Sequence, residues 1–342
     1  MQPLYIQSIS QISAQKPFSE SWMEQPIQYG YGYHRSIDPD FKDFFSPNEA
    51  RRMGRLLKRA IITSREVIKD TQVLPDAIIT GTGLGCIDNT EILLKALSNE
   101  GETISKPACF MQSTHNTISS LVGIDLKCHG YNTTYSHKGI SFECALLDAT
   151  MQLSKNDIHS VLVGAHDEMT PDYFTILQRI GYLGGDMKGF SSETSVSMLL
   201  EKEKNQQTIC RIDGIEICYC PTMKELTSSL ERLLKNAKCP LPSIDGIMIG
   251  VNGNSHNDNT YSKYIPDLFG EVPLLRYKHL FGESYTAPAL GFYTAAICLK
   301  HHHIPSHLFI EDCNGKQGIK HILLYNQFED KNHTLILLSC SN

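Results

Sequence analysis

The chain has 342 residues, of which 31 are Lys or Arg and 37 are Asp or Glu, so its formal net charge is −6. This acidic balance argues against a nucleic-acid-binding protein, which would carry a basic excess, and no nucleic-acid partner is expected. Hydrophobic residues make up 41% and charged residues 20%, a composition typical of a globular chain long enough for two domains or one bilobal unit.

Three further features bear on the compartment. The eleven cysteines are odd in number and irregularly spaced, which does not fit a disulfide framework. The first fifteen residues lack a charged segment followed by an apolar run, so no export signal is visible. The longest mostly apolar stretch, residues 287–299, is too short to span a bilayer. We therefore expect a cytoplasmic protein with no membrane partner.

The first helix signal is the sequence Ser46-Pro47-Asn48-Glu49, a capping box with Pro at the first helical position. Apolar residues then recur every three to four positions as far as residue 68, which predicts one helix. The opposite face is basic and carries Arg51, Arg52, Arg55, Lys58 and Arg59. A solvated face is the favoured interpretation, and a docking surface for an acidic carrier protein is the alternative.

Strands and helices alternate along the rest of the chain. Strand patterns fall at residues 77–80, 160–163, 196–200, 244–249 and 335–338, and helical patterns at residues 141–153 and 288–300. This alternation predicts an α/β fold with mainly parallel sheets covered on both faces.

An internal echo points to a duplication. Residues 78–90 read IITGTGLGCIDNT and residues 248–260 read MIGVNGNSHNDNT. Both begin as a strand, pass through a turn containing Gly, and end on Asp-Asn-Thr, with a separation close to half the chain. Since strand, turn and helix start agree together, we expect two duplicated α/β halves.

Seven segments, in order along the chain, resemble a β-ketoacyl synthase: residues 41–61, 81–86, 107–149, 161–168, 191–203, 251–258 and 278–291. The resemblance implies the thiolase-like fold, with five layers in the order α/β/α/β/α. It also implies two halves, residues 1–205 and 206–342, and usually a dimer. The family places much of its dimer contact at the segment PACFMQSTHN, residues 107–116.

The family's chemistry implies three catalytic residues. A Cys at the start of a buried helix takes the acyl group as a thioester, and two His residues assist decarboxylation and stabilise the developing negative oxygen. The equivalent positions here are Gly139, Asn252 and Glu283, while the family's Lys is retained as Lys278. Residues 326–330 replace the glycine-rich gate loop, and Cys128 and Cys144 are interpreted as packed small hydrophobes.

The leading hypothesis is therefore a non-catalytic subunit of the chain-length-factor type. It would act with an active ketosynthase and an acyl carrier protein in fatty acid, polyketide or aryl-polyene-type biosynthesis. No cofactor is expected, because residues 81–85 are mis-spaced for a dinucleotide-binding loop. No metal is expected either, because His301, His302 and His303 lack further ligands at a defined spacing.

Two alternatives stay open. One is an acyltransferase or condensing enzyme that uses non-standard residues near Ser136 and His137, with Glu283 as base and with His115 and His256 close by. The other is a homodimer that binds an acyl chain or a carrier protein as a scaffold. The sequence does not discriminate a homodimer from a heterodimer.

Overall fold

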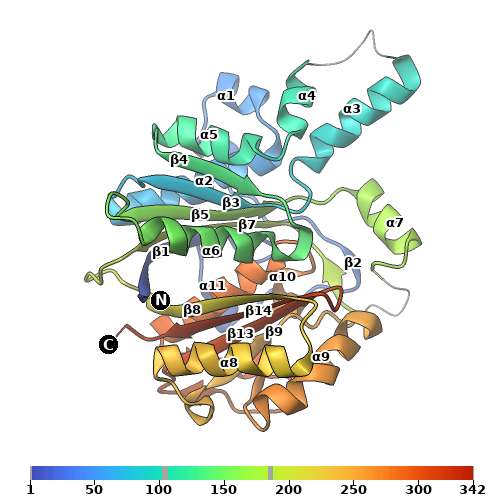
Figure 1. Ribbon diagram of the computed structural model, residues 1–342. Helices are drawn as coiled ribbons and strands as arrows, with labels where there is room; N and C mark the ends of the chain where they lie inside the picture. The colour runs from blue at the N-terminus through green and yellow to red at the C-terminus, as the bar shows by residue number, and fades with distance from the viewer. Residues whose placement is uncertain (1, 102–106, 184–187, 342) are drawn as a thin grey trace.

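The computed structural model describes residues 2–101, 107–183 and 188–341 (Figure 1). Its strands are β1 (Leu4–Ile12), β2 (Gly32–Tyr33), β3 (Ala77–Gly81), β4 (Tyr131–Tyr135), β5 (Ser160–Asp167), β6 (Phe190–Ser191), β7 (Thr194–Glu201), β8 (Cys210–Tyr219), β9 (Gly246–Ile249), β10 (Leu274–Arg276), β11 (His303–Ile304), β12 (Lys316–Gln317), β13 (His321–Phe328) and β14 (Asn332–Ser339). Its α-helices are α1 (Pro47–Arg52), α2 (Arg55–Thr71), α3 (Ile87–Glu100), α4 (Pro107–Ser113), α5 (Thr117–Leu126), α6 (Ser141–Leu153), α7 (Pro171–Arg179), α8 (Met223–Ala237), α9 (Ser255–Phe269), α10 (Lys278–Phe281) and α11 (Ala287–Lys300).

A ten-stranded mixed sheet organises the molecule, in the order β10-β9-β13-β14-β8-β1-β7-β5-β3-β4. Strand β1 joins its two sides, because it pairs with β7 over most of its length and with β8 at residues 4–6. The two sides stack face to face with α6 and α11 between them, while α2 and α5 cover one outer face and α8 and α9 cover the other (Figure 1). These layers are the α/β/α/β/α arrangement expected from the sequence.

The prediction of mainly parallel sheets is wrong. β3, β4 and β5 pair in parallel, as do β9, β10 and β13, but β1, β7, β8 and β14 make antiparallel pairs. The physical reason lies in the connections. Only three residues join β13 to β14, and such a short turn can connect only antiparallel neighbours.

Apolar side chains fill the spaces between the layers in one central cluster and two outer ones. The largest core cluster lies between the two sides of the sheet and includes Phe142 and Leu146 of α6 with Leu290 and Phe292 of α11. A second cluster lies under α8 and α9, and a third lies under α2 and α5. Helix α11 is buried from Ala287 to Leu299, as expected for a helix that is apolar on all sides.

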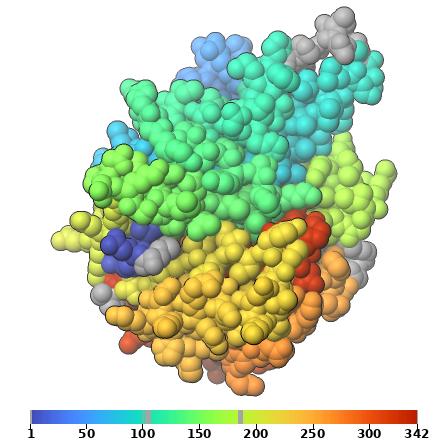
Figure 2. Space-filling model, viewed as in Figure 1, coloured from blue at the N-terminus to red at the C-terminus, as the bar shows by residue number. Residues whose placement is uncertain are grey.

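Within the part of the chain that the structure describes, no helix has the length and the apolar character needed to cross a membrane. The apolar stretch at residues 287–299 is instead the central core helix α11. Figure 2 shows the seam between the two sides of the molecule. Along it, green side chains of the first half meet yellow and orange side chains of the second, and red C-terminal strands reach the surface beside α7.

The segment expected as one helix from residue 46 to residue 68 is two helices. The capping box is present at Ser46, but α1 ends at Arg52 and α2 starts after Gly54. Gly is a poor helix former, and the backbone N–H of Gly54 donates instead to the side chain of Gln112 at 3.1 Å.

The basic face of this segment is the expected solvated face only at Arg51 and Arg52, which are exposed. Arg59 is fully buried, with its guanidinium 2.6 Å from a carboxylate oxygen of Asp38 and 2.8 Å from one of Glu193. Arg55 also pairs with Asp38, and the Lys58 ammonium lies over the ring of Phe41. These three cations therefore serve contacts within the chain.

The echoed segments form equivalent strand–turn–helix units with different fates. Asp88-Asn89-Thr90 lies in α3, which projects from the body of the molecule (Figure 1). Asp258-Asn259-Thr260 lies in α9, which packs on the sheet through Tyr261 and Ile265. Helix α9 of the second unit thus covers the sheet, whereas helix α3 of the first unit projects away from it.

Candidate functional site

The turn between β4 and α6 contains Gly139, the position at which the sequence resemblance predicts the family's nucleophile. It is a single 3₁₀ turn, Lys138–Ile140, in which Lys138 has φ of 45°, a left-handed conformation that is costly for a side-chain-bearing residue. The Ser141 hydroxyl donates to the Thr82 carbonyl oxygen at 2.9 Å. Gly81 allows this close approach, because a Cβ there would lie 2.5 Å from the Ser141 carbonyl oxygen. The start of α6 is therefore clamped against the end of β3.

Gly139 is buried in this turn, and an aromatic ring occupies the space beside it. A Cβ at Gly139 would lie 2.3 Å from the ring of Phe328, the last residue of β13. The Phe328 ring also packs against Tyr285 and Tyr182, with centroid distances of 6.0 and 6.5 Å. A side chain at position 139 therefore requires Phe328 to move.

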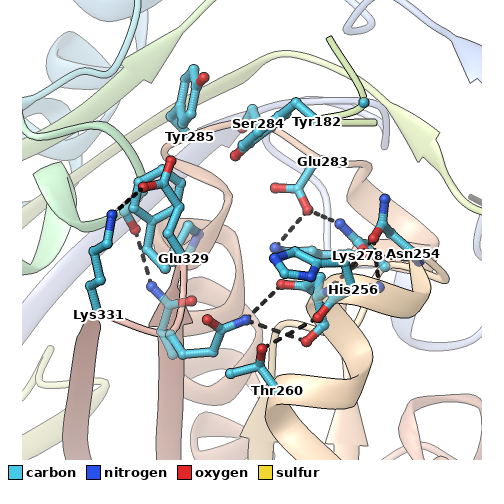
Figure 3. Close-up of a pocket in the computed structure, with 18 of the residues that line it drawn as sticks. Tyr182, Asn254, His256, Thr260, Lys278, Glu283, Ser284, Tyr285, Glu329 and Lys331 are labelled. Carbon is cyan, nitrogen blue, oxygen red and sulfur yellow. Dashed lines mark hydrogen bonds and ion pairs between the residues drawn. The ribbon is translucent and has the colours of Figure 1, made fainter. Parts of the chain in front are cut away.

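Gly139 forms part of the wall of a pocket with a volume of 460 Å³. Figure 3 shows the other walls, which come from the start of α9, the segment between α10 and α11, and the turn between β13 and β14. The polar side chains that line it include Asn252, Asn254, His256, Lys278, Glu283, Ser284, Glu329 and Lys331. Tyr182 and Tyr285 line the pocket as well.

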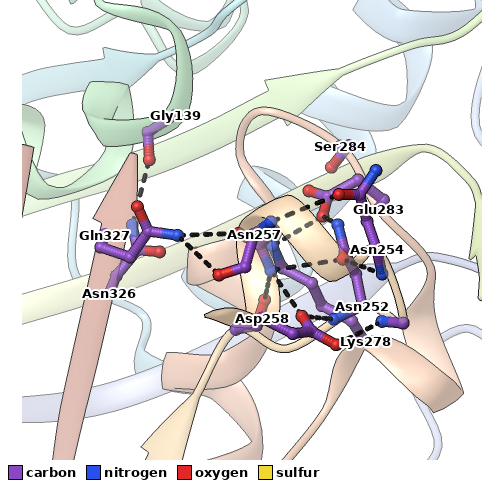
Figure 4. Close-up of polar contacts among 12 residues, drawn as sticks. Gly139, Asn252, Asn254, Asn257, Asp258, Lys278, Glu283, Ser284, Asn326 and Gln327 are labelled. Atoms are coloured by element: carbon purple, nitrogen blue, oxygen red, sulfur yellow. Dashed lines mark hydrogen bonds and ion pairs between the residues drawn. The ribbon is translucent and has the colours of Figure 1, made fainter. Parts of the chain in front are cut away.

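A buried ion pair stands at the floor of the pocket. The Lys278 ammonium donates to a Glu283 carboxylate oxygen at 2.7 Å, and these side chains are only 7% and 8% exposed. The Asn252 amide donates to the same oxygen at 2.5 Å (Figure 4). The positive charge of Lys278 is thus neutralised within the site, and one of the two amide hydrogens of Asn252 is engaged by the same carboxylate.

The backbone holds Glu283 in place from both sides. Its N–H donates to the Phe190 carbonyl oxygen at 2.8 Å, and its carbonyl oxygen accepts from the Ser192 N–H at 3.0 Å. The adjoining residue Glu193 is the buried partner of Arg59. The ion pair under α2 therefore anchors the segment that positions Glu283.

The loop that carries Asn252 is tied to α9. The Asp258 carboxylate accepts the backbone N–H groups of Asn252 and Gly253, each at 3.0 Å. The Asn254 side chain caps the helix by accepting from the N–H groups of His256 and Asn257. The loop conformation is therefore set by the helix that follows it.

A buried glutamate lies directly beneath the turn at residue 139. The Asn326 amide donates to Glu143 at 2.7 Å and to the Gly139 carbonyl oxygen at 3.1 Å, and the Thr334 hydroxyl donates to Glu143 at 3.2 Å. Burial raises the pKa of Glu143 to about 7, against the opposing effects of these hydrogen bonds. The other carboxyl oxygen of Glu143 is buried without a hydrogen-bond partner in the described structure.

The structure brings some of the residues expected from the sequence together and separates others. Gly139, Asn252, Lys278 and Glu283 all line the one pocket, as does His256. The remaining candidates, which lie outside its lining, are His115, Cys128, Ser136, His137 and Cys144.

The individual positions of these remaining candidates explain their separation. Ser136 and His137 are exposed, and His115 packs beside Gly85. The Cys128 thiol donates to the Pro75 carbonyl oxygen at 3.2 Å, and burial raises the pKa of Cys144 to about 11. The Cys144 thiol is therefore in the protonated form at neutral pH.

Sequence reasoning missed Glu143, Tyr182 and Tyr285 as site residues. The first had a usable signal, because an acidic residue falls between Phe142 and Ala145 in a helix expected to be buried. The tyrosines had none, since α7 and the segment after Glu283 approach each other only in the folded chain.

Comparison with known proteins adds a family and a fold. The model of the β-ketoacyl synthase N-terminal domain matches residues 22–231. No curated protein matches the sequence. Among solved structures, the ishigamide ketosynthase/chain length factor is similar, with a TM-score of 0.84, 16% identity and coverage of 100% of both chains.

Two other solved structures share the fold. One contains the ketosynthase ApeO in complex with its chain length factor ApeC from Xenorhabdus doucetiae, with a TM-score of 0.81, 14% identity, and coverage of 99% of this chain and 98% of that one. The other is a β-ketoacyl synthase from Burkholderia phymatum, with a TM-score of 0.79, 13% identity and coverage of 100% of both chains.

Proposed function

Because this chain belongs to the β-ketoacyl synthase family, we propose that it is a non-condensing subunit of the chain-length-factor type. It acts with an active ketosynthase and an acyl carrier protein in fatty acid, polyketide or aryl-polyene-type biosynthesis. The pairing of Glu283 with Lys278 and Asn252 is the observation that carries this proposal.

The chemistry of condensation explains why that pairing matters. Decarboxylation of a malonyl donor develops negative charge on a thioester oxygen, and hydrogen-bond donors must stabilise it. A carboxylate only accepts hydrogen bonds, and its negative charge opposes a developing oxyanion. Glu283 also accepts hydrogen bonds from the Asn252 amide and the Lys278 ammonium, the donors nearest to it. The pocket therefore lacks the electrostatics of a condensing site.

The nucleophile position supports the same conclusion. Gly139 offers no side chain, and the Phe328 ring fills the space into which an acylated residue would project. The thiols nearest in sequence, those of Cys128 and Cys144, do not line the pocket. An acyl-enzyme on this chain is accordingly not expected.

A partner subunit is supported by the surface around β4. This strand ends the ten-stranded sheet, and an unpaired strand edge is a template for pairing with another chain. Exposed apolar residues lie on the neighbouring elements: Phe110 and Met111 on α4, Ile124 on α5, and Tyr131 on β4 itself, with exposed fractions of 61%, 69%, 72% and 40%. Such a group favours burial against a second subunit.

Intact-mass spectrometry tests the proposal directly. The chain is incubated with acyl- and malonyl-carrier protein thioesters, alone and with a candidate active ketosynthase. We expect no adduct on this chain and an acyl group on the partner, with a product length that depends on the presence of this chain.

A stable acyl adduct on this chain would contradict the proposal. Peptide mapping would then name the nucleophile, and an adduct at Ser136 would favour the non-standard enzyme. Self-association without any effect on a ketosynthase product would favour the homodimeric scaffold instead.

A further inference from the structure

A second cavity adjoins the first on the far side of Asn252 and Lys278, which line both. It has a volume of 600 Å³, within the range of small-molecule sites. It is formed by α9, the ends of β9 and β10, and residues 188–189 and 310. None of the chemistry described above uses it.

Its lining is largely apolar. Ile249 and Tyr261 are buried at its base, Ile265 is nearly so, and Ile310 is 38% exposed at its rim. The apolar side chains that line it are Ile249, Val251, Tyr261, Ile265, Leu274 and Ile310. A ligand with an aliphatic body would bury apolar surface here.

The charges in the lining leave a positive excess. Among the described residues, Asp258 is the one acid in the lining, and its oxygens accept hydrogen bonds from Asn252, Gly253 and Asn257. The Arg276 guanidinium and the Lys188 ammonium form no ion pair or hydrogen bond with any residue in the described ranges. They are the two cations free to meet a ligand.

An imidazole ring whose two nitrogens are buried lies in the same lining as Arg276. His279 lines the same cavity, and both of its ring nitrogens are buried without a partner among the described residues. Burial, together with the charge of Arg276, lowers the pKa of His279 to about 3, so the ring is neutral at neutral pH. The ring therefore adds no charge beside Arg276, and because its nitrogens are buried, Arg276 and Lys188 are the groups that can meet an anion.

We propose that this cavity binds a medium-chain aliphatic carboxylate, with the chain against Ile249, Ile265 and Leu274 and the carboxylate at Arg276. Lys188 adds positive charge at the mouth, and the His279 ring faces the same space. An apolar lining joined to uncompensated cations selects an amphipathic anion over a neutral lipid or an amine. This site goes beyond the proposed function and does not depend on it.

Decanoate is the probe for the test, titrated into the full chain alone and followed by isothermal calorimetry. Arg276→Met should weaken decanoate binding by about tenfold, because a charge-assisted hydrogen bond is lost. Ile310→Asp should weaken it by a similar factor, about tenfold, by placing a negative charge at the exposed rim. Decanol and decylammonium should bind more weakly than decanoate.

Two matched controls separate a local effect from a general one. Arg51→Met removes an exposed arginine on α1, and Ile176→Asp charges an exposed isoleucine on α7, and neither should change the affinity for decanoate. A diazirine analogue of decanoate should label peptides from α9 or β10. Differential scanning calorimetry, which measures thermal unfolding, verifies that each of these variants is folded.

Three results would overturn the inference: no binding of decanoate to the unmodified chain, equal binding by Arg276→Met, or decanol binding as tightly as decanoate. Since neither a ketosynthase nor a carrier protein is present, this test can fail while the proposed function stands, and the reverse also holds.

Discussion

At the scale of single residues, Gly139 and Phe328 form one unit. The missing side chain at position 139 and the ring that takes its place are complementary, because a Cβ would lie 2.3 Å from that ring. Replacing Gly139 alone with a nucleophile therefore introduces a clash as well as a thiol. The packing around Gly139 thus leaves no room for a side chain unless the Phe328 ring moves.

We expect Gly139→Ala to lower the free energy of unfolding by about 2 kcal/mol, the usual cost of overpacking. In the double variant Gly139→Ala/Phe328→Ala the two effects should be less than additive, because the removed ring makes room for the methyl group. Urea unfolding of the two single variants and the double variant gives the coupling energy. Strict additivity would mean that the ring and position 139 do not contact each other.

Glu143 makes stability depend on pH in an identifiable direction. Its pKa is raised by burial to about 7, so the folded chain binds this proton more tightly than the unfolded chain does. The stabilisation is present at low pH and is lost as pH rises from about 4.5 to about 7, with a total of about 3 kcal/mol. The groups around Glu143 are Asn326, Thr334 and, at longer range, Lys278.

Glu143→Gln isolates this contribution. Since the amide cannot ionise, the variant should gain stability relative to the unmodified chain between about pH 5 and about pH 8, by up to about 3 kcal/mol. Urea unfolding at the two pH values measures the difference. Other titrating groups, such as Glu168, whose pKa burial raises to about 7, are common to both proteins and cancel. A pH-independent difference would refute the assignment.

At the scale of elements, α2 shows how a helix face is assigned by its neighbours. The sequence predicts a helix here with a basic outer face, yet Arg59 is fully buried between Asp38 and Glu193. Arg55, one turn earlier, pairs with the same Asp38 but remains 37% exposed. Periodicity alone does not distinguish these two arginines, because their partners lie in distant segments.

The two arginines therefore make a matched pair for mutation. Arg59→Met should lower the free energy of unfolding by about 3 kcal/mol or more, because it leaves the buried Glu193 carboxylate without a cation, while Asp38 keeps Arg55. Arg55→Met should cost about 1 kcal/mol or less, as expected for an ion pair open to solvent. Thermal and urea unfolding compare them. An equal loss of unfolding free energy in the two variants would show that the buried ion pairs of Arg59 do not stabilise the fold more than the exposed pair of Arg55.

Element boundaries also illustrate what sequence patterns predict well. Helix α6 matches the expected range of residues 141–153, and α11 begins one residue before the expected start at residue 288. Strong periodicity and buried apolar faces made these two helices visible. The antiparallel pairing of β1, β7, β8 and β14 was not visible, because pairing direction depends on where strands meet in space. We propose residue 205, in the connection from β7 to β8, as the boundary between the duplicated halves.

At the scale of the whole molecule, the sheet edge at β4 is the feature that points beyond the chain. Ile124 on the neighbouring helix α5 is 72% exposed, and Tyr219 at the other end of the molecule is equally so at 73%. The first lies beside the unpaired edge strand and the second does not. Mutating each of the two residues therefore distinguishes an effect of losing a contact with a partner from an effect of changing any exposed apolar residue.

Ile124→Asp should weaken association with the ketosynthase partner by about tenfold or more, since a charge would be buried at a packed interface. Tyr219→Asp should leave association unchanged. Surface plasmon resonance against the partner measures both, and unfolding of the isolated chain should be nearly the same for the two variants. Equal loss of association in both would remove β4 as the contact surface.

The sequence by itself determined the α/β class and the family resemblance. It also predicts two duplicated halves and the replacement of the expected catalytic residues at Gly139, Asn252 and Glu283. These properties reside in local patterns and in residue identities that can be compared along the chain. Only the tertiary structure decided that Glu283 pairs with Lys278, that Phe328 fills the space beside Gly139, and that Arg59 is buried. Each of these joins segments far apart in sequence, and their contact depends on how the layers stack, which no local pattern encodes.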